Sequence, residues 1–198
     1  MLVIGLTGGI GMGKSTVAKM FESLGIPAFN ADEAVHALQA QNGKAIPAIA
    51  AAFPGTVQNG VLNRAALRNI VLADPAALRR LEKIIHPLVR RAQKDFCAAA
   101  TRQQRRAILL DIPLLFESGT GRARKKTMDL TLTVSCPRDI QINRVSARGV
   151  MSPEQIATII AKQMPDTENR RRADVTIRTG LSRFHTLRTV RRLVKDLL

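Results

Sequence analysis

Apolar runs and helical patterns alternate along the chain, as is typical of a parallel α/β fold. Residues 2–6, LVIGL, form a continuous apolar run, which favours a strand buried on both faces of a sheet. A helix is predicted next, because four apolar residues fall at helical spacing: Val17, Met20, Phe21 and Leu24. Gly25 ends this helix, and residues 26–29 predict a second short strand that delivers Asp32 at or just beyond its end.

The middle of the chain, residues 33–106, is rich in alanine and leucine and is predicted to be mostly helical. Its breaks fall at three turn-forming pairs: Asn42-Gly43, Pro54-Gly55 and Asn59-Gly60. Asp74-Pro75 predicts a helix start, with an N-cap aspartate and proline at the first helical position. Because the stretch is too long for a simple crossover between strands, we predict a helical subdomain inserted into the sheet order.

The second half of the chain returns to alternating strands and helices. Three strands are predicted, at residues 107–111, 130–135 and 175–177. The first of them ends in the carboxylate of Asp111. Helical sequence follows Pro137, and Ser152-Pro153-Glu154-Gln155 predicts a capping box that opens another helix. A last helix has apolar residues on one face and arginines on the other, so the whole pattern predicts one sheet core with two helical excursions.

The candidate chemistry is concentrated in residues 8–15, GGIGMGKS, between the first strand and the first helix. This segment satisfies G-x-x-x-x-G-K-[ST] in the position that a phosphate-binding loop requires. Glycines let successive backbone N–H groups point at one anion, and the helix N-terminus adds partial positive charge. We expect Lys14 to reach the β- and γ-phosphates of a nucleotide and the Ser15 hydroxyl to bind Mg²⁺. The expected nucleotide-binding residues are Gly9, Ile10, Gly11, Met12, Gly13, Lys14, Ser15 and Thr16.

Two aspartates stand at the ends of predicted strands. Asp111 is expected at the same sheet edge as the phosphate loop, where its carboxylate would hold Mg²⁺ directly or through water. Capping a helix is the alternative role for Asp111. Asp32 is a candidate to accept a proton from an attacking hydroxyl. It is equally a candidate N-cap for a helix that starts at Glu33, and spacing leaves the two roles open.

Three further residues attract attention by their spacing. Arg144 and Arg148 lie one helical turn apart on the same face, so both guanidinium groups could close over transferring phosphates. A solvated basic face is the alternative. His86 precedes Pro87, which predicts extended backbone at the histidine, and spacing alone favours a structural role for it.

The net charge of +16 raises the question of an anionic partner, since 31 lysines and arginines stand against 15 acidic residues. The excess gathers at residues 102–106, 122–126, 170–172 and 188–192. Solvated faces account for most clusters of this kind. An aromatic content of 3%, without Trp or Tyr, argues against the stacking surfaces of a single-strand nucleic-acid binder. We therefore expect no nucleic-acid partner.

Cysteine usage and hydropathy set the expected compartment. Cys97 and Cys136 cannot build a disulfide framework, and no Cys/His spacing suggests a zinc site. The sequence shows no signal peptide, and no apolar run approaches the roughly 20 residues of a membrane span. A cytoplasmic protein without membrane attachment is expected, and its oligomeric state is left open.

Several segments beyond the phosphate loop together resemble one enzyme family. These segments are Asn30-Ala-Asp32, Leu62-Asn-Arg-Ala-Ala-Leu67, Ile85-His-Pro-Leu-Val89, Asp111-Ile-Pro-Leu-Leu-Phe-Glu117, Gln163-Met-Pro165 and Arg172-Ala-Asp174. With TGGIGMGKST near the start, they make nearly the whole chain similar to the dephospho-coenzyme A (dephospho-CoA) kinases. Asn30 stands where that family usually has an aspartate, and Ile177-Arg-Thr179 where it often has an Asp-Asn pair near the adenine.

The resemblance implies a P-loop core with a parallel sheet flanked by helices, a helical substrate-binding insertion and a two-helix lid. The core would comprise residues 1–32, 107–136 and 173–198, the dephospho-CoA-binding region residues 33–106, and the lid residues 137–172. The implied reaction is the phosphorylation of the ribose 3′-hydroxyl of dephospho-CoA by ATP with Mg²⁺, which gives CoA and ADP.

The same resemblance implies roles for single residues. Asp32 would be the base, and Lys14 and Arg144 would assist the transfer. Arg148 would contact ATP, while Asp32, His86 and Leu115 would contact dephospho-CoA. Ser15 and Asp111 would hold Mg²⁺. Two alternative functions stay open: another small-molecule P-loop kinase, of the nucleoside monophosphate or shikimate type, and a nucleic-acid-stimulated P-loop NTPase.

Overall fold

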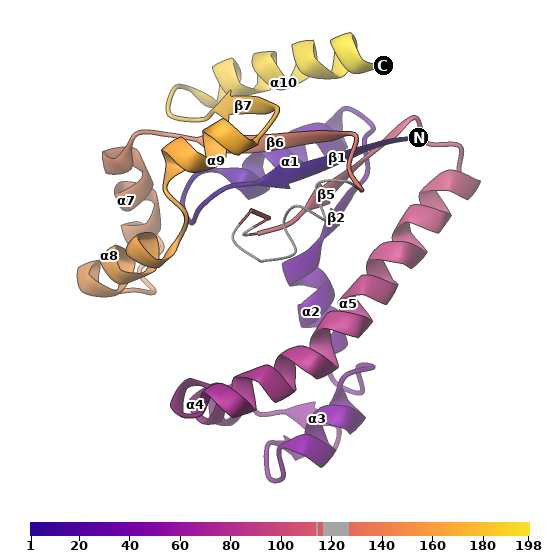
Figure 1. The fold of residues 1–198 in the computed structure, drawn as a ribbon, viewed down its shortest axis with the longest axis vertical. Coiled ribbons are helices and arrows are strands. Elements are labelled where there is room, and N and C mark those ends of the chain that lie inside the picture. Colours follow the sequence, from indigo (N-terminus) through magenta and orange to yellow (C-terminus); the bar gives the residue numbers. More distant parts are fainter. Residues whose placement is uncertain (114, 117–126) are drawn as a thin grey trace. The chain divides into compact units, whose positions relative to one another are not determined.

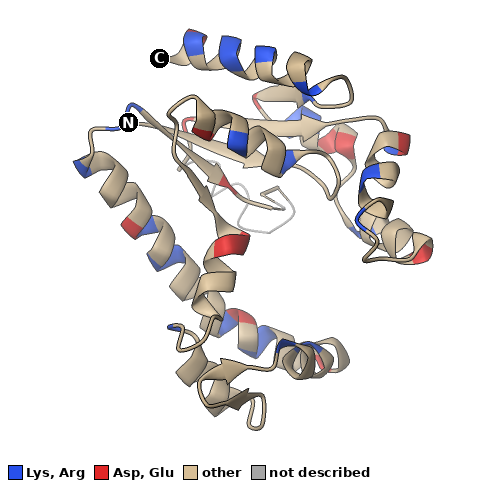
Figure 2. Cartoon of the chain, turned by 180° about the vertical axis from the view of Figure 1, so that it is seen from behind, with Lys and Arg blue, Asp and Glu red and all other residues tan. Residues whose placement is uncertain are grey.

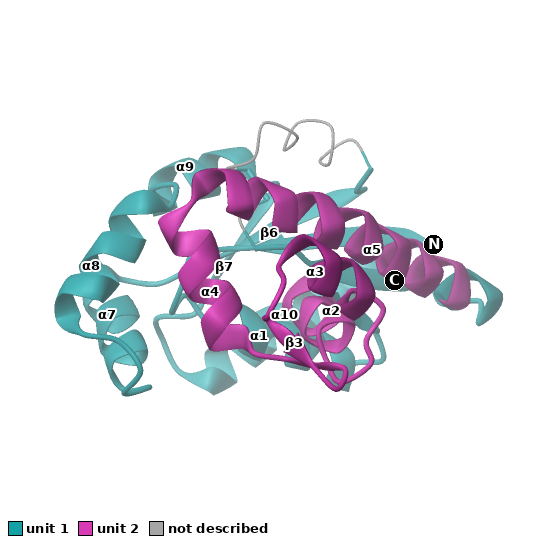
Figure 3. Cartoon of the chain, turned by 90° about the horizontal axis from the view of Figure 1, so that it is seen from below, with its two compact units in different colours: residues 1–29, 100–198 teal, residues 30–99 magenta. Residues whose placement is uncertain are grey.

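The computed structural model describes residues 1–113, 115–116 and 127–198, which divide into two compact units (Figure 3). Unit 1 consists of residues 1–29 and 100–198, and unit 2 consists of residues 30–99. Glu117 of the family-like segment and the basic cluster at residues 122–126 lie outside the described residues. The division into core, substrate region and lid expected from the sequence is finer than this one, and its boundaries stay a prediction.

Unit 1 is built on a parallel sheet. Within the described chain, the sheet has the strand order β2-β5-β1-β6-β7. The strands are β1 (Leu2–Thr7), β2 (Ala28–Asn30), β5 (Ala107–Asp111), β6 (Leu130–Ser135) and β7 (Val175–Arg178). β1 pairs in parallel with β5 and with β6, and β6 pairs in parallel with β7. Parallel pairing brings the segments that follow these strands to one edge of the sheet.

Unit 1 also contains helices, some of which lie in residues 137–172, the segment expected as the lid (Figure 1). They are α1 (Lys14–Ser23), α7 (Arg138–Ser146), α8 (Pro153–Lys162), α9 (Asp166–Arg172) and α10 (Arg183–Leu197). α1 packs against α10, and α9 contacts β6. The predicted capping box of α8 is confirmed, because the side chain of Ser152 accepts from Gln155 N–H and that of Gln155 accepts from Ser152 N–H.

The predicted apolar runs make the core of unit 1. Ile4, Leu6, Leu109 and Leu132 are fully buried in it, and each such side chain contributes about 1.5–3 kcal/mol of burial free energy. The apolar face predicted for the last helix is confirmed, since Val190 is fully buried and four further α10 residues pack against the same core: Leu187, Leu193, Val194 and Leu197.

Unit 2 has its own apolar core and is mostly helical. It contains α2 (Ala31–Leu38), α3 (Ile46–Ala52), α4 (Arg64–Ala73), most of α5 (Pro75–Arg102) and an antiparallel pair of short strands, β3 (Val57–Gln58) and β4 (Val61–Leu62). Ala45, Ile49 and Ala77 are fully buried in this core. The predicted helix start at Asp74 is confirmed, because its Oδ1 accepts a 2.7 Å hydrogen bond from Ala76 N–H.

The predicted backbone at His86 is wrong. His86 and Pro87 lie inside the 28-residue helix α5, not in extended chain. Pro87 has no N–H and therefore cannot bond the carbonyl of Lys83 one turn earlier. The flanking turns nevertheless keep the helical geometry, and burial of Ile85 in the core of unit 2 stabilises the helix at this point.

The second predicted strand is displaced along the chain. It was expected at residues 26–29 and lies at Ala28–Asn30. Pro27 has no N–H for strand pairing, although its carbonyl accepts from Leu109 N–H at 2.9 Å. The strand therefore begins after the proline.

The basic clusters at residues 170–172 and 188–192 lie on the helices α9 and α10. Figure 2 shows Lys and Arg along α10 and in the last turn of α9. In α9, hydrogen bonds from Arg171 and Arg172 hold the pKa of the Glu168 carboxyl down at about 2. Cations in the last turn of a helix also complement its dipole. Within the described residues, no helix has the length and hydropathy needed to cross a membrane.

Candidate active site

The phosphate loop follows β1 and leads directly into α1. Gly11 (φ 73°) and Gly13 (φ 91°) have left-handed backbone, which disfavours side chains with a Cβ. A Cβ on Gly11 would also lie 2.6 Å from Val145 Cγ2 and 2.8 Å from the Gln141 carbonyl oxygen. Gly13 is the N-cap of α1, so the first N–H groups of that helix have no intrahelical acceptor and are directed at the loop. This geometry suits a bound phosphate.

Lys14 and Asp111 form a close ion pair beside the loop. Leu6 of β1 is in register with Asp111 of β5, so strand pairing places the aspartate next to the start of the loop. Lys14 Nζ lies 2.6 Å from Asp111 Oδ1. The side chain of Lys14 is 15% exposed and that of Asp111 is 1% exposed. The pair therefore places a cation and a carboxylate where phosphates and a metal ion would meet.

The donor set at this point fits Mg²⁺. Ser15, exposed in the first turn of α1, offers a hydroxyl, and Asp111 offers a carboxylate. Mg²⁺ prefers such oxygen ligands and is usually held by one or two carboxylates together with substrate phosphates and water. Among the residues that the structure describes, no group of three His, Cys, Asp or Glu forms an all-protein metal site. Ser15 and Asp111 therefore suit a Mg²⁺ ion that is held partly by the protein and partly by the phosphates of a bound nucleotide.

Arg144 reaches from α7 to the residue that follows β7. Its Nη2 donates to the Thr179 carbonyl at 2.6 Å, and its Nη1 donates to Thr179 Oγ1 at 3.2 Å. Thr179 Oγ1 in turn donates to the Met12 carbonyl at 2.6 Å. These contacts tie the arginine to the phosphate loop.

A cavity of about 400 Å³ lies beside this network. It is lined in part by Gly11, Gly13, Arg144, Arg148, Thr179 and Arg183. Arg148 is exposed at the cavity, whereas Arg144 is half-buried by its contacts with Thr179. The cavity adjoins both the glycines of the phosphate loop and the start of α1, which is the position that a nucleoside attached to loop-bound phosphates would need.

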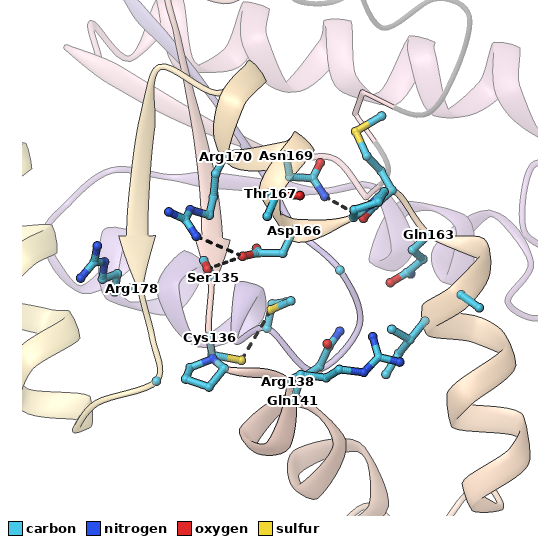
Figure 4. Close-up of a pocket in the computed structure, with 18 of the residues that line it drawn as sticks. Ser135, Cys136, Arg138, Gln141, Gln163, Asp166, Thr167, Asn169, Arg170 and Arg178 are labelled. Carbon is cyan, nitrogen blue, oxygen red and sulfur yellow. Dashed lines mark hydrogen bonds and ion pairs between the residues drawn. The ribbon is translucent and has the colours of Figure 1, made fainter.

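A second cavity, of about 770 Å³, lies at the base of the lid segment (Figure 4). Asp166 borders it, accepting from Ser135 Oγ at 2.7 Å. Cys136 also borders it, with its Sγ 3.5 Å from Met12 Sδ. Burial raises the pKa of the Cys136 thiol, and the nearby Arg144 charge offsets part of that increase.

Two expected substrate residues belong to unit 2. Asp32 is exposed in the first turn of α2, and the N-cap of that helix is Asn30, whose Oδ1 accepts from the N–H groups of Asp32 (2.9 Å) and Glu33 (3.2 Å). The alternative prediction that Asp32 caps the helix is therefore wrong. His86 is exposed on α5, and its carbonyl accepts from Arg90 Nε at 3.4 Å.

Leu115, the third expected substrate residue, belongs to unit 1. It is fully buried, and its N–H donates to Thr7 Oγ1 at 3.3 Å. The structure thus brings the phosphate loop, Asp111, Arg144 and Arg148 together within unit 1. Their roles in catalysis and binding stay predictions.

Three residues were missed by reasoning from the sequence. Gln141 and Gln163 both bond the backbone of Ile10, and Thr179 joins Arg144 to Met12. Gln163 stood in a segment that resembled the dephospho-CoA kinases, which was the only signal for it. Thr179 was noted only as part of a departure from that family near the adenine, and Gln141 carried no signal. The partners of both residues are more than a hundred positions away in the sequence.

Comparison with known proteins decides the family. The family model for dephospho-CoA kinase matches residues 2–182. A dephospho-CoA kinase of Mesorhizobium japonicum is 52% identical over 180 residues, which cover 91% of this chain and 88% of the relative. The chain belongs to the dephospho-CoA kinase family.

Solved structures agree with this membership. The match with the crystal structure of TT1252 from Thermus thermophilus covers 100% of this chain and 98% of the TT1252 chain, with 34% identity and a TM-score of 0.82. A dephospho-CoA kinase from Campylobacter jejuni covers 99% and 98%, with a TM-score of 0.69 at 23% identity, and so supports the fold. The expected α/β class is confirmed, and the family match includes every site residue that the sequence predicted.

Proposed function

We infer that the protein phosphorylates dephospho-CoA with ATP and releases CoA and ADP. Membership of the dephospho-CoA kinase family supports the substrate pair. The observation that carries the chemistry is the 2.6 Å contact between Lys14 Nζ and Asp111 Oδ1 beside the phosphate loop. A loop lysine and a strand-end carboxylate are the parts that P-loop enzymes use for phosphoryl transfer.

Lys14 and the loop act on the nucleotide. The N–H groups at the start of α1 bind phosphate oxygens, and Lys14 neutralises the charge on the transferred group. Ser15 and Asp111 would hold Mg²⁺, which when bound supplies positive charge to the β- and γ-phosphates. Asp111 also holds the Lys14 side chain, which limits its freedom before the nucleotide arrives.

Asp32 acts on the acceptor in this proposal. Its carboxylate orients the ribose 3′-hydroxyl and accepts the proton as the new bond to phosphorus forms. Two observations favour this role: Asp32 is exposed, and Asn30 performs the capping that would otherwise occupy it. His86 and Leu115 would contribute to dephospho-CoA binding. The side chain of Leu115 would have to act by shaping the site, since it is fully buried.

Arg144 and Arg148 act from the lid segment. Both line the cavity beside the phosphate loop, and Arg148 is the more exposed of the two. Arg148 would close onto the phosphates of ATP, while Arg144 would assist catalysis from its position against Thr179. Closure removes water and strengthens the attraction between guanidinium and phosphate. We further propose a cytoplasmic enzyme whose partners are small molecules and not nucleic acid.

The test is ATP turnover with one acceptor at a time. Dephospho-CoA, AMP, shikimate and a single-stranded polynucleotide are each added to the protein with MgATP, and ADP formation is measured. We expect turnover with dephospho-CoA alone. Faster turnover with AMP or shikimate would show that dephospho-CoA is not the preferred acceptor. Stimulation by polynucleotide alone would indicate a nucleic-acid-stimulated NTPase and not a small-molecule kinase.

A further inference from the structure

Two glutamines from the lid segment hold one residue of the phosphate loop. Gln141 Nε2, in α7, donates to the Ile10 carbonyl at 2.8 Å. Gln163 Oε1, at the C-cap of α8, accepts from Ile10 N–H at 2.9 Å. Figure 4 shows both glutamines at the border of the larger cavity, one from each helix. The chemistry of the backbone fixes the sense of both bonds, because a carbonyl can only accept and an N–H can only donate.

The bond from Gln141 also orients the next N–H group. The described residues contain no cis peptide bond. In a planar trans peptide, the C=O group and the following N–H group point in opposite directions. Because Gln141 holds the Ile10 carbonyl, the Gly11 N–H of the same peptide points away from Gln141. The preceding peptide is also held at both ends, since the Gly9 carbonyl accepts from Met12 N–H at 3.2 Å.

The glycine at position 9 is explained by the same two contacts. A Cβ on Gly9 would lie 2.9 Å from Gln163 Oε1 and 3.5 Å from Gln141 Nε2. Gly9 has no positive φ that would itself require glycine. Its lack of a side chain therefore makes room for the two carboxamides to reach Ile10.

We propose that Gln141 and Gln163 are positioning residues that couple the lid helices to the phosphate loop. They fix the peptides on both sides of Ile10 and thereby the direction of the Gly11 N–H. A displacement of α7 or α8 is transmitted through Ile10 to the site where phosphate binds. This coupling rests on the proposed function, because it assumes that the loop binds the phosphates of ATP.

The test uses one substitution at two positions. In Q163E the carboxylate still accepts from Ile10 N–H, whereas in Q141E the carboxylate cannot donate and repels the Ile10 carbonyl. Both variants add the same charge beside the same loop residue, so repulsion of phosphate is common to the two. Uncharged Q163M and Q141M remove each bond without adding charge.

The readouts are the dissociation constant of MgATP without acceptor, the kcat with dephospho-CoA, amide exchange at Ile10 and thermal melting. We expect Q141E to bind MgATP about tenfold more weakly than Q163E, the range of one hydrogen bond. Q163M should speed amide exchange at Ile10 and lower kcat. Q163E should bring both the exchange rate and kcat most of the way back to the wild-type values. If the extra buried charge unfolds Q141E, the coupling is tested by the comparison of Q163M with Q163E alone.

The outcomes separate this inference from the proposed function. Equal MgATP affinity in folded Q141E and Q163E, or failure of Q163E to rescue Q163M, overturns the coupling even if the wild-type protein makes CoA. The expected order of MgATP affinities supports the coupling. If the wild-type protein then leaves dephospho-CoA unchanged, only the proposal that dephospho-CoA is the acceptor is refuted.

Discussion

Lys14 of α1 and Asp111 of β5 are joined by a 2.6 Å contact between Nζ and Oδ1, although 97 positions separate them in the sequence. The contact exists because β1 and β5 pair in parallel with Leu6 opposite Asp111. The pair is mostly shielded from water, so removing one partner leaves an uncompensated buried charge. We therefore expect the same two residues to contribute both to the proposed phosphoryl transfer and to the stability of this edge of the sheet.

The first prediction separates these two effects. Lys14→Ala should lower kcat by at least about 100-fold, because charge on the transferred group is no longer neutralised. It should also lower the free energy of unfolding by about 3 kcal/mol, since the buried Asp111 carboxylate loses its cation. Adding Asp111→Asn should recover much of the stability and none of the activity. Steady-state kinetics and denaturant unfolding of both variants check this, and wild-type activity in Lys14→Ala would refute the role of the loop.

The second prediction concerns Asp32. Asp32→Asn should lower kcat by about 10²–10⁴, because an amide cannot take the proton of the hydroxyl. Thermal melting and ATP binding should stay close to those of the wild type, since Asn30 caps the helix. Glu33→Gln, at the next exposed carboxylate of the same turn, is the matched control and should retain activity. Normal turnover in Asp32→Asn would remove this residue from the reaction.

The third prediction uses the helix cap itself. Asn30→Ala removes the oxygen that accepts from the N–H groups of Asp32 and Glu33. It should lower the free energy of unfolding by about 1 kcal/mol. Asn30→Asp restores an accepting oxygen and should return the stability to near the wild-type value. Chemical unfolding of the two variants measures the difference, and equal stability of both would show that the cap contributes nothing.

The fourth prediction concerns the lid arginines. Arg144→Ala and Arg148→Ala should each lower kcat far more than they raise the KM for dephospho-CoA, because their charge acts mainly in the closed state. Arg144→Lys should not rescue Arg144→Ala, since an ammonium cannot reproduce the two-pronged contact with Thr179. Kinetics with both substrates varied check this, and two unimpaired alanine variants would indicate a solvated basic face.

A fifth prediction follows from the buried thiol of Cys136. Burial raises the pKa of this group, so the folded protein holds the proton more tightly than the unfolded chain. The stabilisation is present below the ordinary thiol pKa of about 8.5 and is lost as the pH rises through and beyond it. Alkylation of Cys136 at pH 7 should accordingly be slower than that of a free thiol, as measured by mass spectrometry. Labelling at the rate of a free thiol would contradict the burial.

Local patterns predicted much of the fold of unit 1. The phosphate loop, the strands β1 and β5 and the capping box of Ser152 and Gln155 depend on neighbouring residues, and each lies where the sequence indicated. The failure at His86 arose because a local steric preference before Pro87 was outweighed by the rest of a long helix.

The site was predicted less completely, because several of its contacts are long-range. Asp32 was one candidate for the cap of α2, and Asn30 was not considered, although Asn30 ends β2 in the structure and caps the helix. The contacts of Gln141, Gln163 and Thr179 with the phosphate loop depend on how α7, α8 and β7 pack. No spacing along the chain reveals such partners.

The most direct measurement of the central claim is the identity of the product. The protein is incubated with MgATP and dephospho-CoA, and the product is examined by ³¹P NMR and mass spectrometry. We expect one new phosphate monoester on the ribose 3′-oxygen, with one ADP formed for each CoA. ADP formed while dephospho-CoA stays unchanged, or a phosphate on any other oxygen, would contradict it.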